Sequence, residues 1–292
     1  MAYPDATSAT GTTEFIDVTT ADVYIPEIWS PQVVDARENN LLFAALVDSK
    51  YEKDLTKGDV IHVQTRNHLS TTAKTANTAV NYETLTETQV DITINKHYYS
   101  AIAVEEIVDA QAFLDQAAMY APELGYALAL QEDDDLAALV DNFSQNVGTL
   151  ITGLSDENVR RAVQYLDDAN APDEDRVMIV SPAEWSNLIG LDRYVHSSYE
   201  KSTGQISSKA KRGHFGSIYG LDCFKSTNVE GTNAAGHDNC VMQQSALALV
   251  RQIMPKTVSQ YDIDYLARKV VSHELYGVQE IRDDHGVWAK GA

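Results

Sequence analysis

Apolar residues recur at helical spacing between Leu114 and Phe143, with carboxylates and glutamines between them. The stripe comprises Leu114, Ala117, Ala118, Ala121, Leu128, Leu136, Leu139 and Phe143. A spacing of three and four residues predicts an amphipathic α-helix. At 1.5 Å per residue such a helix is roughly 45 Å long, so we expect it to run across a domain as a strut.

Two residues modify this prediction. Pro122 lacks an N–H and its ring crowds the carbonyl four residues back, so the helix should kink between Met119 and Pro122 or restart with Pro122 in its first turn. Glu132 falls on the apolar stripe, where a buried unpaired carboxylate is costly. We therefore expect the face around Glu132 to be only partly covered, or to be completed by another chain.

A long hairpin is predicted before the strut. Residues 60–63 form a short apolar run after the turn Lys57-Gly58-Asp59, and residues 89–94 alternate polar and apolar, which is typical of a half-buried strand. Roughly 25 polar residues lie between the two runs, and unstructured connections of that length are uncommon inside compact domains and usually functional. We interpret residues 57–96 as a hairpin that projects from the body.

The second half alternates strand and helix signals. Ser155 is a helix cap followed by Asp156 and Glu157, and this helix should reach about Ala169. Residues 176–180 form a buried strand, and Ser181-Pro182-Ala183-Glu184 predicts a capping box that opens a helix to about Ile189. This order indicates an α+β fold.

Further strands are predicted towards the end of the chain. They cover residues 98–104, 221–226, 239–242, 264–276 and 278–282, and the last two should form a sheet against which the strut packs. Near the start, Ser30-Pro31 predicts a short helix over residues 31–39. Residues 1–23 are rich in Thr and Ala and contain no Lys or Arg, so an extended arm is expected there.

The charge is unusually acidic and unevenly distributed. The 22 basic and 43 acidic residues give a net charge of −21. Residues 1–150 carry 7 basic and 24 acidic groups (−17), and residues 151–292 carry 15 and 19 (−4). An acidic surface repels polyphosphate, which argues against a nucleic-acid reader with a basic groove. It suits solubility, a salty medium, or a wall that touches DNA without binding it.

The sequence contains no recognisable catalytic or metal-binding motif. Phosphate-binding and dinucleotide-binding glycine loops are absent. His273-Glu274 begins like a zinc-protease helix, but Gly277 stands where the second histidine should be. Cys223 and Cys240 fit neither a disulfide framework nor a metal site. We therefore expect no enzyme activity, catalytic residue, cofactor or metal, and with neither an apolar span nor a signal peptide, we expect no membrane association.

The layout resembles the major capsid proteins of tailed bacteriophages, which share the Hong Kong 97-like fold. The segments that carry the resemblance are residues 25–30 (IPEIWS), 57–60 (KGDV), the strand and helix from 98 to 141, 176–182 (RVMIVSP), 213–221 (GHFGSIYGL), and Tyr276-Gly277. The resemblance covers nearly the whole chain. It rests on the order of the elements more than on any single motif.

The resemblance implies a domain plan. It assigns residues 1–30 to an N-terminal arm, 31–56 to a short helix and a connection into the body, and 57–97 to an extended loop. Residues 98–170 would form a peripheral domain with a spine helix at 113–143, 171–255 an axial domain, and 256–292 the return strands of the peripheral domain.

The resemblance also implies partners and contact residues. The partners would be copies of the chain in pentamers and hexamers, a separate scaffolding protein, a portal, and packaged DNA enclosed without sequence-specific binding. The location would be the virion capsid, assembled in the host cytoplasm. The expected subunit-contact residues are Phe15, Ile25 and Trp29 in the arm, Lys74 in the hairpin, Glu132 on the strut, and Lys209, Lys211 and Arg212 in the one basic run.

Two other functions fit the same sequence. The nearest is an encapsulin-type bacterial nanocompartment, whose shell resembles the same fold and encloses enzymes. The other is a soluble cytoplasmic enzyme with an unrecognised site. Particle size separates the enzyme from the shells, because an enzyme should run as a small oligomer.

Overall fold

The computed structural model describes residues 41–54, 57–66, 68–84, 87–111, 116–191 and 214–292. Backbone contacts divide the chain into residues 1–37 and 38–292, and all the described residues belong to the second unit. The arm and the helix predicted for residues 31–39 lie outside the described residues.

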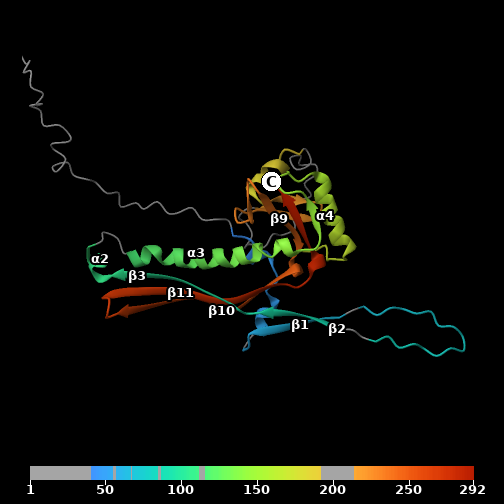
Figure 1. The fold of residues 1–292 in the computed structure, drawn as a ribbon, viewed down its shortest axis with the longest axis horizontal. Coiled ribbons are helices and arrows are strands. Elements are labelled where there is room, and N and C mark those ends of the chain that lie inside the picture. The colour runs from blue at the N-terminus through green and yellow to red at the C-terminus, as the bar shows by residue number, and fades with distance from the viewer. Residues whose placement is uncertain (1–40, 55–56, 67, 85–86, 112–115, 192–213) are drawn as a thin grey trace, which may run out of the picture. The chain divides into compact units, whose positions relative to one another are not determined.

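A three-stranded antiparallel sheet carries the long helix (Figure 1). Its strands, in spatial order, are β10 (Leu247–Asp262), β11 (Ala267–Glu280) and β3 (Lys96–Glu105). The helix α3 (Gln116–Ala137) packs against β3 and β11. The prediction that the strut lies on a sheet made from the closing strands is therefore confirmed.

The strut is shorter than predicted. It ends at Ala137, where the hydrogen bond from Leu139 N to Leu136 O tightens the chain towards the short helix η3 (Val140–Asn142). Pro122 lies in the second turn of α3, so the helix does not restart there. The buried face repeats every four residues, at Leu124, Leu128, Glu132 and Leu136. Glu132 is thus on the buried stripe, as the spacing indicates.

The two closing strands predicted on either side of Gly277 are one strand, β11, because glycine is accommodated inside it. A Cβ at position 277 would lie 2.5 Å from the carbonyl oxygen of Thr93, the last residue of β2 (Glu87–Thr93). Its partner β10 was not predicted, since residues 254–261 are exposed and show no alternation of burial. β10 also runs through residue 255, where the predicted domain boundary falls.

A second, seven-stranded sheet forms the main core with helices α4 (Asp156–Asp168) and α5 (Pro182–Leu188). The spatial order is β4, β12, β9, β5, β7, β6, with β8 paired to β9. The strands are β4 (Asn146–Gly148), β5 (Arg176–Val180), β6 (His214–Ile218), β7 (Leu221–Lys225), β8 (Gly231–Thr232), β9 (Gly236–Gln243) and β12 (Gly286–Gly291). The predicted strands at 176–180, 221–226 and 239–242 are confirmed.

Side-chain caps explain where the two helices begin. Ser155 Oγ accepts a hydrogen bond from Asn158 N, and Ser181 Oγ accepts one from Glu184 N. The predicted capping box is only half formed, however. The Glu184 carboxylate is buried and accepts from Leu154 N at 2.8 Å and from Ala292 N at 2.9 Å, so it fastens the last strand instead of closing the box.

Short helices complete the described chain. They are α1 (Phe43–Leu46), η2 (Lys50–Asp54), α2 (Glu106–Gln111), η5 (Gln244–Ala246) and η6 (Asp283–His285). None of the helices among the described residues has the length and apolar character needed to cross a membrane.

Candidate subunit-contact surfaces

The hairpin is a surface with almost no core of its own. β1 (Val60–Arg66) pairs antiparallel with β2, from Val60 opposite Thr93 to Arg66 opposite Glu87. Beyond the paired strands, residues 68–84 are all exposed, and Tyr82 is 94% exposed. Only the base is anchored, where Ile92 is fully buried against the sheet strand β10. The prediction of a long hairpin is confirmed.

The hairpin tip is held together by a few polar contacts. Glu83 accepts hydrogen bonds from the backbone and hydroxyl of Ser70, at 2.9 and 3.1 Å. Lys74 Nζ donates to the carbonyls of Thr75 and Thr78. The two arms enclose a hollow of about 720 Å³ lined only by tip residues, so they do not pack on one another. The contact role expected for Lys74 stays a prediction.

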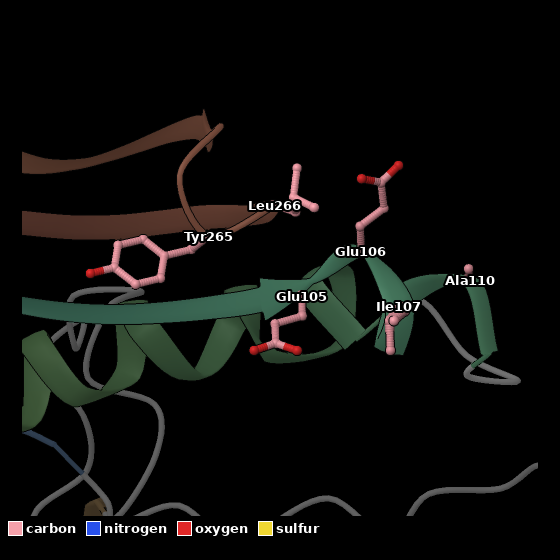
Figure 2. Close-up of a pocket in the computed structure, with 6 residues that line it drawn as sticks. All are labelled: Glu105, Glu106, Ile107, Ala110, Tyr265 and Leu266. Atoms are coloured by element: carbon pink, nitrogen blue, oxygen red, sulfur yellow. The ribbon is translucent and has the colours of Figure 1, made fainter.

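A second exposed surface lies at the turn between β10 and β11. Ile263 is 77% exposed, Tyr265 72%, Leu266 58% and, on α2, Ile107 68%. A pocket of about 340 Å³ lies here (Figure 2). It is lined by Tyr265 and Leu266 from the turn, by Ile107 and Ala110 of α2, and by Glu105 and Glu106. We call Ile107, Ile263, Tyr265 and Leu266 the turn patch. Exposed apolar groups gathered in this way mark interaction surfaces.

The turn patch was not predicted from the sequence. The only signal was a tyrosine and two large aliphatic residues within the turn segment 263–266, where polar residues are usual. The contribution from α2 could not be read from the sequence, because it depends on the pairing of β3 with β11, which brings Glu105 opposite Ala267.

Both alternatives expected for the face around Glu132, partial cover or completion by another chain, are wrong. The Glu132 side chain is 5% exposed, and Arg251 of the same chain pairs with both of its oxygens, at 2.6 and 2.7 Å. Arg251 also lies 3.4 Å from Glu52 on η2. The buried carboxylate is thus neutralised within the subunit, because β10 places an arginine under the apolar stripe of α3.

The remaining contact residues lie outside the described residues. These are Phe15, Ile25, Trp29, Lys209, Lys211 and Arg212. Their roles therefore stay predictions from the sequence.

The two cysteines lie in the interior of the subunit. Cys223 and Cys240 are both buried and free, and burial raises the pKa of the Cys223 thiol to about 12. Such thiols are unreactive at neutral pH. No group of three His, Cys, Asp or Glu side chains suited to a metal ion occurs in the part of the chain that the structure describes.

Similarity to known proteins is found in structure and not in sequence. No protein-family model matches the chain, and no curated protein does. A chain from Mycobacterium phage Che8 superimposes with a TM-score of 0.75 at 22% identity, over 91% of this chain and 97% of that chain. A chain from the capsid of the cyanophage P-SCSP1u gives 0.72 at 15% identity, over 94% of both.

The mature capsid of bacteriophage PhiM1 provides a third match, with a TM-score of 0.69 at 15% identity over 91% of each chain. The chain has the fold of these phage capsid proteins. The overlap covers more than 90% of this chain and of each of the three, so the shared fold is not confined to a small part of the molecule.

Proposed function

We propose that this protein is the major capsid protein of a tailed bacteriophage, a non-enzymatic subunit that assembles into an icosahedral shell around double-stranded DNA. The observation that carries the proposal is the match over more than 90% of both chains to subunits of phage capsids. A match over nearly the whole length of both chains favours a shared use more than a match of one part would.

The exposed surfaces support self-assembly. The hairpin tip and the turn patch expose apolar side chains such as Tyr82 and Tyr265, and neither surface has enough buried area to be stable through its own packing. Copies of the chain would complete both surfaces. Many weak contacts of this kind, repeated by symmetry, close a shell.

We further propose the Hong Kong 97-like plan for the parts of the chain. The hairpin at 57–97 would be the extended loop over a neighbour, and α3 the main part of the spine helix at 113–143. Residues 98–170 and 256–292 would form the peripheral domain, 171–255 the axial domain around five-fold and six-fold centres, and 1–30 the arm. The sheets support this division in part, since β5 to β9 of the seven-stranded sheet lie within 171–255, but β4 and β12 of the same sheet fall in the peripheral ranges and β10 crosses residue 255.

The net charge of −21 supports an enclosed partner that is not bound tightly. A wall of carboxylates facing packaged DNA would repel phosphate and let the DNA slide. Assembly would take place in the host cytoplasm, with a separate scaffolding protein and a portal as further partners. A basic inner surface in a shell reconstruction would contradict the DNA-repelling wall.

Sedimentation velocity and negative-stain electron microscopy of the purified chain test the function. We expect pentamers and hexamers, or closed shells, whose proportion increases with protein concentration. Tyr82→Ser and Leu266→Ser, which alter exposed side chains, should reduce assembly without altering the circular dichroism spectrum. A small, concentration-independent oligomer with buried tips would overturn the proposal.

A further inference from the structure

A network of charged side chains joins α3 to the sheet beneath it. Glu132 on α3 pairs with Arg251 on β10, and Arg251 reaches Glu52 on η2. One turn further along α3, Asp135 pairs with Lys96 on β3 at 2.9 Å and accepts a hydrogen bond from Tyr276 on β11 at 2.6 Å. The network therefore connects the helix to all three strands.

Glu274 lies within this network without a hydrogen bond. It belongs to β11, two residues before Tyr276, and is 1% exposed. Neither carboxylate oxygen has a hydrogen-bond partner among the described residues. The charges that act on it are Glu132 and Asp135 from α3 and Arg251 from β10. A buried carboxylate left in this way is costly when it is ionised.

A count of charges shows why a proton on Glu274 favours the closed arrangement, in which α3 is packed on its sheet. The network holds two cations, Arg251 and Lys96, and three paired carboxylates, Glu52, Glu132 and Asp135. An ionised Glu274 adds a fourth carboxylate, and neither of its oxygens has a hydrogen-bond partner among the described residues. Burial, and secondly the charge of Glu132, raise the pKa of Glu274 to about 7, although Arg251 acts in the opposite direction.

We propose that Glu274 is a proton-dependent lock between α3 and its sheet, which holds the helix firmly when it carries a proton and weakens the junction when it ionises. The lock follows from the placement of an unpaired carboxylate between the Glu132–Arg251 pair and the Asp135–Lys96 pair. It does not depend on the proposed capsid function, and it can be measured on the unassembled chain.

The sign of the effect follows from the pKa in the closed and open states. A raised pKa in the closed state means that this state binds more protons than an open state with the ordinary glutamate pKa. The junction is therefore most stable below the ordinary pKa, and it weakens as the pH rises to about 7. Above that pH, no further change comes from this group.

Hydrogen exchange of the α3 amides, converted to protection factors at each pH, tests the lock. Between pH 5.5 and pH 8.5 the protection factors of the wild-type chain should fall by roughly tens of fold. Glu274→Gln should reduce this fall to a few fold, because glutamine fills the same space without titrating, and the remainder comes from Asp133 of the same helix, whose pKa burial raises to about 6. Glu123→Gln, at an exposed position of the same helix, is the matched control and should behave like wild type. If the protection factors of Glu274→Gln fall as much as those of the wild-type chain, the proposed lock is refuted.

A direct titration covers the case in which Glu274→Gln does not fold. Glu280 on the same strand also has its pKa raised to about 7, by burial and by its contact with Asp283, so it must be removed first. In Glu280→Gln labelled with carbon-13 at glutamate carboxyl groups, one resonance should titrate near neutral pH. If every glutamate of that variant titrates near its ordinary pKa, the proposal is refuted.

Discussion

The seven-stranded sheet and the hairpin differ in how they are stabilised. The sheet buries its apolar side chains against α4 and α5, and Leu166, Met178 and Leu221 are fully inaccessible to solvent. The hairpin pairs its strands over seven residue pairs, yet its tip leaves Tyr82 and Leu69 in solvent. One region carries the stability of the single subunit. The other carries surface that no described residue buries, and the comparison therefore separates the residues that stabilise the subunit from those that the proposed function assigns to assembly.

Removal of the hairpin tip should have the largest effect. Replacement of residues 70–83 by a short Gly/Asn linker is geometrically allowed, because Ser70 and Glu83 are hydrogen-bonded to each other. We expect complete loss of shells in electron micrographs, while the free energy of unfolding of the unassembled chain changes by less than about 0.5 kcal/mol. A polar replacement of the same length is the control that separates tip length from side-chain chemistry. Normal shells from the shortened chain would contradict the assembly role.

A matched pair of truncations should give opposite results in the two regions. Leu166→Ala removes a fully buried side chain of α4 and should cost about 3 kcal/mol in chemical denaturation, because it leaves a cavity. Tyr82→Ala removes a larger side chain from the tip and should leave the unfolding midpoint unchanged, but it should raise the concentration needed for assembly. If Tyr82→Ala destabilised the unassembled chain by a comparable amount, the tip would have a packing partner within the subunit.

The smallest effect on stability is expected at the turn patch. Leu266→Ser lowers the apolar area at an exposed turn and should change the free energy of unfolding by less than about 0.5 kcal/mol. Light scattering should nevertheless show slower assembly, since the patch loses part of its apolar surface. The adjacent Asp264→Ser is the control, because it alters an exposed turn residue that does not line the pocket. Equal assembly rates for the two variants would remove the patch from the contact surfaces.

Much of the fold could be predicted from local signals. The caps at Ser155 and Ser181 begin helices because they act through neighbouring backbone N–H groups. β10 could not be predicted, because it is an edge strand of the three-stranded sheet and its residues 253–261 are all exposed, so no alternation is required. The role of Glu184 was likewise hidden, since its partners Leu154 and Ala292 are distant in sequence.

The contact surfaces were predictable only in part. The polar sequence between the strands of the hairpin indicates a projection, and this is what the structure shows. Glu132 shows the limit of a one-dimensional pattern. The spacing correctly placed it on the buried face of α3, but its neutralising partner Arg251 is 119 positions away and is brought there by β10. A partner at that separation leaves no periodic signal near the carboxylate.

The glycine at position 277 allows close contact between the root of the hairpin and strand β11, through which a force on the hairpin would reach the sheet. Because the Thr93 carbonyl occupies the space where a β-carbon would project, the root of the hairpin rests directly on β11, near the C-terminal end of this central strand of the sheet. A neighbour that pulls on the tip would therefore strain a hydrogen-bonded ladder, which resists shear along many bonds at once. The hairpin could then transmit a pulling force from its tip to β11 without detaching from the sheet.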